Sequence, residues 1–179
     1  TILDYVTVEY GGGGTGNIYF TSASPTIKNS VIRKSANYGI YASSSSAIIQ
    51  DSTITENGSY GIYSSYSPLT ATGNAISNNG SYGLYDSGSA ALLSGNTFSG
   101  NASYPVRMSI NQTGSTNTYG TNGTNAIEVV GGQVTQSLTM KNQAIPYIIT
   151  SSINIYSTTG LAPTLTIEPG VTLKFNQNI

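Results

Sequence analysis

The chain contains no cysteine and no histidine among its 179 residues. Without cysteine, neither a disulfide nor a thiolate metal site can hold the fold, and without histidine the commonest general base and metal ligand is missing. Charge is also scarce, because only 7% of the residues are charged and the formal net charge is -1. The sequence has no basic stripe for a phosphate backbone, so we do not expect nucleic acid as a partner.

Long hydrophobic runs are missing as well. No apolar stretch approaches the roughly 18 residues of a membrane-spanning helix, so we expect no membrane insertion. The chain begins at Thr1 in a strand-like pattern, without the charged and apolar regions of a signal peptide. We expect a soluble chain that is either mature or excised from a longer protein.

Internal repetition is what the sequence does contain. The tetrapeptide YGIY occupies 38–41 and 60–63, and YGLY occupies 82–85, so the motif returns every 22 residues. Longer segments align at the same interval without a gap: SVIRKSANYGIY (30–41), STITENGSYGIY (52–63), NAISNNGSYGLY (74–85) and NTFSGNASYPVR (96–107). A period between about 20 and 50 residues is typical of a solenoid.

Three aliphatic columns run through the aligned repeats. The columns are Ile27, Ile49, Ala71 and Leu93; Ile32, Ile54, Ile76 and Phe98; and Ile40, Ile62, Leu84 and Val106. No repeat has apolar residues at i, i+3, i+4 and i+7, which excludes an amphipathic helix. Three inward points per repeat predict three short strands, and stacked repeats predict an all-β, single-stranded parallel β-helix of about 22 residues per coil.

The glycine of each tetrapeptide has a structural interpretation. Gly39, Gly61 and Gly83 occupy equivalent positions. We expect a bend there, at which a positive φ or a close backbone approach excludes a side chain.

The periodicity also predicts the organisation of the chain. Residues 1–110 form regular coils, in which Val8 precedes the Ile32 column and Ile18 precedes the Ile40 column. Residues 111–125 are turn-forming throughout and predict a loop or a wider coil. Apolar alternation returns over 126–179, which predicts less regular β coils.

The repeats resemble the N-x-I-x-x-N-x-x-Y-G-I-Y units of right-handed parallel β-helix proteins, of the type found in NosD-like and bacterial or archaeal cell-surface proteins. The resemblance covers residues 1–106 and implies a right-handed solenoid. The segment PTLTIEPGVTLKF (163–175) looks like the one that commonly opens such a domain, yet here it follows the coils. We therefore expect that 126–179 begins a following β-helix unit in a tandem array.

A tyrosine column is the first candidate for a functional face. Tyr41, Tyr63 and Tyr85, with Tyr66 nearby, predict an outward aromatic stripe that would contact a polysaccharide or a partner. The structural alternative is that stacked tyrosines cover the sheet and stabilise its strands. We expect the first tyrosines of the motif to pack at corners: Tyr38, Tyr60, Tyr82 and Tyr104.

Five asparagines begin sequons and are candidates for N-glycosylation: Asn57, Asn79, Asn101, Asn111 and Asn122. The first three fall in one column at the 22-residue interval. Their structural alternative is an asparagine ladder, in which side-chain amides bond to one another and to the bend backbones.

No constellation for catalysis, cofactor or metal stands out. Asp51 and Glu56 share one repeat and Asp86 lies further on, but no column stacks acids. The run GGGGTG (11–16) lacks the Lys-Ser/Thr and the helix of a phosphate loop, and we expect a bend between coils.

These features predict a non-catalytic, extracellular structural or adhesion segment of a larger cell-surface or filament-forming protein. Self-association, end to end or side by side, follows because open β-helix ends expose unpaired backbone groups. The alternative is a polysaccharide-binding module, or a remnant of a polysaccharide lyase or epimerase, that uses the tyrosine stripe. A viral fibre segment is a third reading, although the sequence shows no trimerisation signature.

Overall fold

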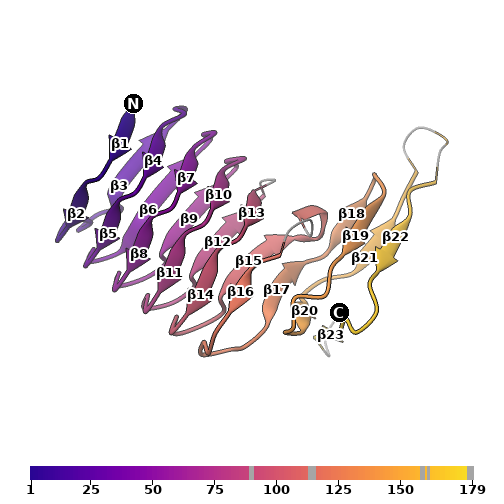
Figure 1. Cartoon of the computed structure of the whole chain (residues 1–179). Coiled ribbons are helices and arrows are strands. Elements are labelled where there is room, and N and C mark those ends of the chain that lie inside the picture. The colour runs from indigo at the N-terminus through magenta and orange to yellow at the C-terminus, as the bar shows by residue number, and fades with distance from the viewer. Residues whose placement is uncertain (89–90, 113–115, 158–159, 161, 177–179) are drawn as a thin grey trace.

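The computed structural model describes residues 1–179 with the exception of 89–90, 113–115, 158–159, 161 and 177–179. The chain winds into a solenoid of about eight turns, with successive coils side by side from the N-terminus to the C-terminus (Figure 1). Each strand pairs with the equivalent strands of the neighbouring coils, and all pairings among the described strands are parallel. The predicted parallel β-helix is therefore confirmed.

Three long sheets form the sides of the solenoid. Sheet A contains β1 (Ile2–Asp4), β4 (Thr26–Lys28), β7 (Ile48–Gln50), β10 (Thr70–Thr72) and β13 (Leu92–Ser94). Sheet B contains β2 (Thr7–Glu9), β5 (Val31–Arg33), β8 (Thr53–Thr55), β11 (Ala75–Ser77), β14 (Thr97–Ser99) and β16 (Thr118–Tyr119). Sheet C contains β3 (Gly16–Thr21), β6 (Tyr38–Ser43), β9 (Ile62–Ser65), β12 (Leu84–Ser87), β15 (Val106–Ser109), β17 (Ile127–Val130), β20 (Tyr147–Ile149) and β23 (Leu173–Phe175).

The later coils carry two smaller sheets and one helical turn. β18 (Gly132–Val134) pairs with β21 (Ile153–Ile155), and β19 (Leu138–Met140) pairs with β22 (Leu165–Ile167). The turn η1 (Ile110–Gln112) follows β15. No helix in the described part of the chain has the length and apolar character needed to cross a membrane.

The three predicted columns are the core. Ile32, Ile54 and Ile76 are fully buried and lie in register across sheet B, and the other two columns are buried in the same way. Val8 pairs with Ile32 and Ile18 with Ile40, as the pattern of the first coil predicted. Because the side chains of a strand alternate between faces, a three-residue strand such as β8 turns one residue inward, and a four-residue strand of sheet C such as β12 turns two.

The segment 111–125 was predicted as a loop or a wider coil. It is not only a loop, because β16 lies within it and pairs with β14 of the preceding coil. Register continues with a shorter coil, since Asn101 bonds to Asn122, 21 residues on. This coil is one residue shorter than the 22-residue repeat, which explains why the alignment is lost here while the coil continues.

Each regular coil turns its three corners on residues with left-handed backbone. These residues follow sheet A (Tyr5, Asn29, Asp51, Gly73, Gly95), sheet B (Tyr10, Lys34, Glu56, Asn78, Gly100) and sheet C (Ser22, Ser44, Tyr66, Gly88). The φ angles of the non-glycine members lie between 47° and 62°. One αL residue per strand end reverses the inward and outward alternation, so the residue after it points into the solenoid.

Close approach, not a positive φ, explains the glycines of the tetrapeptides. Gly61 is absent from the left-handed residues. A Cβ at Gly61 would lie 2.7 Å from both the Asn79 amide nitrogen and the Gly83 carbonyl oxygen. Gly39 and Gly83 meet the equivalent atoms of their own neighbouring coils. Only glycine lets the backbone of one coil lie this close to the next.

Candidate functional site

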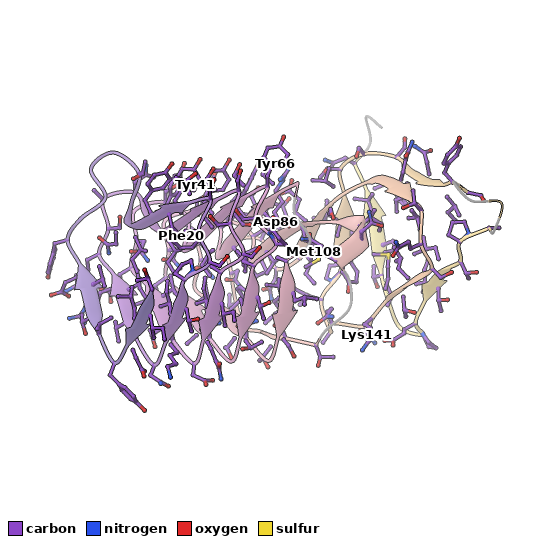
Figure 2. The ribbon with its side chains drawn as sticks, turned by 90° about the horizontal axis from the view of Figure 1, so that it is seen from above. Phe20, Tyr41, Tyr66, Asp86, Met108 and Lys141 are labelled. Atoms are coloured by element: carbon purple, nitrogen blue, oxygen red, sulfur yellow. The ribbon has the colours of Figure 1, made fainter. Side chains whose placement is uncertain are left out.

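Sheet C carries the tyrosines on its outer surface. Tyr41 pairs in register with Tyr19 on one side and Tyr63 on the other, and Tyr63 pairs with Tyr85. In Figure 2, Tyr41 and Tyr66 lie along the outer rim of the solenoid, whereas Phe20 and Met108 lie toward its interior. The outward orientation of Tyr41, Tyr63 and Tyr85 follows from the inward positions of Ile40, Ile62 and Leu84 beside them.

Two tyrosine columns interlock on this surface. We call the set the tyrosine face: Tyr19, Tyr38, Tyr41, Tyr60, Tyr63, Tyr82, Tyr85 and Tyr104. Ring centroids are 4.9 Å apart for Tyr41 and Tyr63, and 5.0 Å apart for Tyr60 and Tyr85. Tyr38 and Tyr60, predicted only as corner packing, thus contact the second tyrosine of their own coil and of the next coil. Stacked and edge-to-face pairs at these distances stabilise the sheet beyond their buried area.

Mutual stacking leaves ring edges and hydroxyls as the outer surface. Tyr41, Tyr63 and Tyr85 are half-buried, and Tyr19 at the first coil is 50% exposed. Burial raises the pKa of the Tyr38 and Tyr60 phenols above the ordinary value. The face offers a row of phenol groups to any partner.

A polar cluster closes the C-terminal end of the tyrosine face. Arg107 and Glu128 occupy the next two positions in the column of Tyr85. The Arg107 guanidinium lies 4.3 Å from the centroid of the Tyr85 ring, and its Nε is 3.6 Å from Glu128 Oε1. The Tyr82 hydroxyl donates to Glu128 Oε2 at 2.6 Å. Burial, followed by the bond to Glu128, raises the pKa of Tyr82 well above its usual range.

Apart from the 22-residue interval, no sequence motif indicates this cluster. Tyr82 and Glu128 are 46 residues apart, and only the register of sheet C brings them together. Arg107 could have been found, because it stands 22 residues after Tyr85 in the fourth aligned repeat. A guanidinium in an aromatic column indicates a cation–π contact.

Tyr66 lies apart from the tyrosine face. It is a corner residue with a φ of 47° and is 72% exposed. Its ring lies over the corner glycine of the next coil, Gly88, where an added Cβ would be 3.1 Å from the ring. Of the four tyrosines predicted to form the stripe, Tyr41, Tyr63 and Tyr85 belong to the tyrosine face, and Tyr66 is a separate corner residue.

The asparagine column forms the predicted ladder inside the solenoid. Its members are Ser35, Asn57, Asn79, Asn101 and Asn122. In the central example, Asn57 donates its backbone N–H and its Nδ2 to Asn79 Oδ1, at 3.2 and 2.9 Å. Asn79 in turn donates Nδ2 to Asn101 Oδ1 and to the Ile54 carbonyl. Each amide satisfies backbone groups at a buried corner that would otherwise lack partners.

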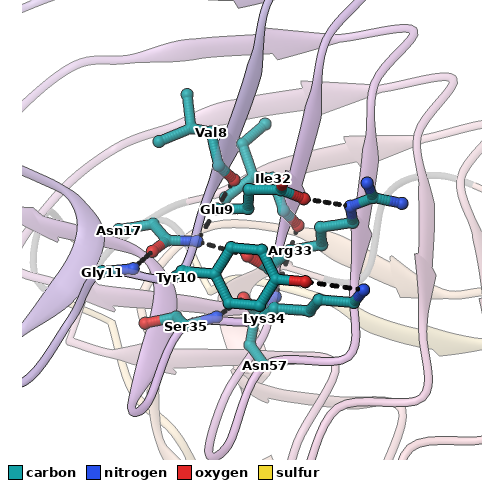
Figure 3. A network of polar contacts seen from close by, with 10 residues as sticks. All are labelled: Val8, Glu9, Tyr10, Gly11, Asn17, Ile32, Arg33, Lys34, Ser35 and Asn57. Atoms are coloured by element: carbon teal, nitrogen blue, oxygen red, sulfur yellow. Dashed lines mark hydrogen bonds and ion pairs between the residues drawn. The ribbon is translucent and has the colours of Figure 1, made fainter.

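The N-terminal beginning of this ladder is shown in Figure 3. The backbone N–H of Ser35 donates to Asn57 Oδ1. In the first coil Asn17 replaces a ladder residue, and its Nδ2 donates to the carbonyls of Val8 and Arg33. Outside the solenoid, Arg33 pairs with Glu9 at 2.6 Å.

A second ladder runs parallel to the first and was not predicted. It comprises Ser30, Ser52, Asn74, Asn96 and Asn117. Asn74 donates its Nδ2 to Asn96 Oδ1 and to the Ile49 carbonyl. The first four members directly follow a left-handed corner residue, as Asn74 follows Gly73. The sequence signal for this second ladder was a serine or asparagine that lies two residues before each member of the Ile32 column.

Burial separates the five sequons. Asn57, Asn79 and Asn101 are 1–2% exposed, and Asn122 is 7% exposed. At each of these four positions, the Nδ2 atom that would carry a glycan donates a hydrogen bond inside the solenoid. Asn111 is the exposed member, and its Nδ2 donates to the Gln133 carbonyl at 3.3 Å. The ladder interpretation of the column is confirmed.

The three carboxylates considered for catalysis lie apart. Asp51 and Glu56 are exposed corner residues on either side of β8. Asp86 is buried in sheet C, where its Oδ2 accepts a bond from Gln112 and its Oδ1 has no partner among the described residues. The described part of the chain contains no group of three acidic, histidine or cysteine side chains that could hold a metal ion.

Parallel coils, buried polar ladders and stacked outer residues define a β-solenoid. A family model described as right handed beta helix region matches residues 16–168, so the chain belongs to the right-handed β-helix family. No curated protein and no solved structure matches the chain.

Proposed function

We propose that this chain is a non-catalytic structural or adhesion segment of a larger extracellular surface or filament-forming protein. The observation that carries the proposal is the use of polar and aromatic side chains along the solenoid axis. The side-chain amide of Asn79 hydrogen-bonds to Asn57 in the preceding coil and to Asn101 in the following coil. The ring of Tyr63 contacts tyrosine rings in both neighbouring coils. Side chains used in this way hold coils together and resist bending.

Low charge supports the same role. Three ion pairs connect described residues, and two of them, Lys28 with Asp4 and Arg33 with Glu9, are partly exposed and join the first two coils. Ion pairs of this kind contribute little to stability. The stability of the proposed segment, as a rigid spacer, therefore depends on hydrogen bonds and aromatic stacking. Salt screens these interactions far less than it screens exposed ion pairs.

Mechanical unfolding of single molecules tests the proposal. Wild type is expected to stay folded under load and then to extend in steps of one or a few coils, because each coil contacts only its neighbours. Asn79→Ala should lower the unfolding force, and the exposed Asn154→Ala should not. Wild type that yields at the force of Asn79→Ala would argue against a load-bearing role.

Self-association extends this proposal to assemblies of the chain. Sedimentation over a concentration series, with electron microscopy of the same samples, is expected to show oligomers or filaments. A monomer at every concentration, with no filaments, would remove the extension and leave the spacer role to the pulling experiment.

Polysaccharide recognition is the second candidate, and the outward phenol row beside Arg107 favours it. A glycan array that includes neutral and acidic polysaccharides tests it directly. Binding that is lost in Tyr63→Ala and Tyr85→Ala, but kept in the off-face control Tyr5→Ala, would support a ligand role for the tyrosine face. No bound glycan, or binding untouched by these changes, would leave the structural role.

A further inference from the structure

The tyrosine face forms a continuous line of phenols across five coils. Tyr19 contacts Tyr41 at a centroid distance of 5.1 Å, and at the other end Tyr82 contacts Tyr104 at 5.5 Å. Between them, no successive contact in the two interlocked columns exceeds 5.8 Å. A one-electron vacancy created on any ring therefore has a neighbouring ring in van der Waals contact to which it can move.

Tyrosine is also the residue that an oxidant meets at this surface. The sequence has 14 tyrosines and no cysteine, tryptophan or histidine. Its two methionines, Met108 and Met140, are 4% and 0% exposed. Oxidising equivalents that reach the folded chain therefore fall on phenols, since the thioethers lie inside the solenoid and thiols, indoles and imidazoles are missing from the sequence.

A proton acceptor is built into the line. Oxidation of a phenol near neutral pH removes its proton together with the electron. The Tyr82 hydroxyl already donates to Glu128 Oε2 at 2.6 Å, within the range for direct proton transfer. Arg107 holds Glu128 from the other side, so the carboxylate faces the phenol in a fixed position.

We propose that the tyrosine face is an oxidative cross-linking site, at which a peroxide-level oxidant joins tyrosines of successive coils as dityrosine. Two stacked pairs are the closest: Tyr41 with Tyr63, at 4.9 Å and 30° between ring planes, and Tyr60 with Tyr85, at 5.0 Å and 7°. Each pair joins adjacent coils. A bond between rings would therefore add a covalent connection along an axis that hydrogen bonds and stacking alone now hold. This inference goes beyond the proposed structural role and does not depend on it.

The reaction balances with hydrogen peroxide as the oxidant. Each of two phenols loses one electron and its hydroxyl proton, which gives two phenoxyl radicals. The radicals form a carbon–carbon bond between the positions ortho to oxygen. The two ortho hydrogens then leave as protons while both hydroxyls are restored, so the net loss is two hydrogens. Hydrogen peroxide accepts the two electrons and two protons and becomes two molecules of water.

The test treats the purified chain, at low concentration, with a haem peroxidase and hydrogen peroxide. The monomer is separated by electrophoresis, and its proteolytic fragments are analysed by mass spectrometry and dityrosine fluorescence. We expect an intrachain fragment pair, lighter by two hydrogens, that contains Tyr41 with Tyr63 or Tyr60 with Tyr85. Peroxidase without peroxide should give no product.

Phenylalanine variants assign the bond. Tyr41→Phe with Tyr63→Phe, and Tyr60→Phe with Tyr85→Phe, keep the rings and the stacking but cannot form phenoxyl radicals. Each double variant should lose its own fragment pair, and the fourfold variant should lose both, although the stacked pair of Tyr82 and Tyr104, at 5.5 Å, remains in it. The matched control Tyr5→Phe, Tyr10→Phe and Tyr66→Phe removes three exposed tyrosines outside the face and should leave the intrachain product unchanged.

Two outcomes would overturn the proposal. One is dityrosine found only between chains and abolished by the Tyr5, Tyr10 and Tyr66 control. The other is an intrachain product that joins only tyrosines outside the tyrosine face. Circular dichroism of each variant before oxidation checks that the solenoid is intact, and a variant that is misfolded is replaced by its two single substitutions.

Discussion

Left-handed corner residues are the feature for which single-residue changes are most informative. Lys34, Glu56 and Asn78 occupy the same corner with φ between 53° and 56°, and Gly100 fills the equivalent place one coil later. A side chain in this conformation costs free energy because its Cβ crowds the backbone. The strain of a left-handed side chain is therefore present in the coils of Lys34, Glu56 and Asn78 and absent where glycine occupies the corner.

Glu56→Gly tests that cost. We expect the free energy of unfolding to rise by about 1 kcal/mol, because glycine adopts this backbone without strain, although it also makes the unfolded chain more flexible. Chemical denaturation measures the change. As a matched control, Thr55→Gly lies in strand β8, where the same substitution should destabilise the protein. Equal effects at the two positions would contradict the corner argument.

Gly61→Ala tests the close approach of neighbouring coils. The added Cβ would lie 2.7 Å from two atoms of the next coil, so the coils must move apart. We expect a loss of about 1–3 kcal/mol in the free energy of unfolding, as for an overpacked core. Gly13→Ala is the control, because its Cβ would meet nothing within 4 Å. A comparable loss in the control would show that glycine content, not contact, sets stability.

At the scale of elements, ladders matter more than any one strand. Strands of three residues, such as β8 and β11, would not be stable alone, and each gains its backbone partners only from stacking. The asparagine ladders satisfy the corners between these strands, where the sheet hydrogen bonds stop. Removing one rung therefore affects two coils.

Asn79→Ala measures the contribution of a rung. The change removes the acceptor of Asn57 and the donor to Asn101 and leaves buried polar groups unpaired. We expect a loss of about 3 kcal/mol or more, at 1–3 kcal/mol for each unsatisfied group. Differential scanning calorimetry compares it with the exposed Asn154→Ala. A transition temperature equal to that of the control would show that water replaces the rung.

Tyr147 in β20 gives the sheet an alkaline limit. Its side chain is 1% exposed, its hydroxyl donates to the Lys141 carbonyl at 2.6 Å, and burial raises its pKa to about 12. The unfolded chain loses this proton near pH 10. The protonated Tyr147 therefore contributes its full share to the free energy of unfolding below pH 10. This contribution, about 3 kcal/mol in total, is lost as the pH rises from 10 to 12.

Tyr147→Phe should make the fall in stability between pH 10 and pH 12 shallower, measured by urea denaturation at a series of pH values. The exposed Tyr156→Phe serves as the control and should keep the wild-type slope. The variant loses one hydrogen bond at all pH values, so the slope and not the absolute stability is compared. An unchanged slope would place the alkaline sensitivity elsewhere, for example on Tyr82 or Tyr119.

At the scale of the whole molecule, the solenoid changes along its axis. The coils that contain residues 20–110 bury complete aliphatic columns, whereas no described residue within 151–176 is buried. Ile155, Ile167 and Phe175 are about half exposed. Stability in a solenoid is close to a sum of coil and interface terms, so it should differ between the two ends.

Hydrogen exchange tests this gradient. Backbone amides of β6, β9 and β12 should exchange slowly, and those of β21, β22 and β23 should exchange faster by orders of magnitude, because local opening there exposes little apolar surface. Mass spectrometry after pepsin digestion resolves these regions. Uniform protection along the chain would show that the solenoid opens as one unit.

Prediction from sequence succeeded where the coil length was constant. Ile32, Ile54 and Ile76 repeat every 22 residues and were assigned to one core column, and the Asn57 column was assigned as a ladder. Beyond residue 107 less regular β coils were predicted but not their register, because the next coil has 21 residues and the following pair, Ile127 with Tyr147, is separated by 20. A fixed period cannot detect a coil that keeps its register while changing its length.

The sequence by itself determined the fold class, the three core columns and the asparagine ladder, because each depends on residue type recurring at one interval. The tertiary structure alone decided which side chains contact one another when their separation in sequence is not a multiple of 22 residues. It interlocked two tyrosine columns that the sequence kept separate, brought Glu128 to Tyr82, and placed Glu56 and Tyr66 in a left-handed backbone that neither residue favours. The physical reason is that stacking supplies enough hydrogen bonds and buried surface to override local preference at the corners.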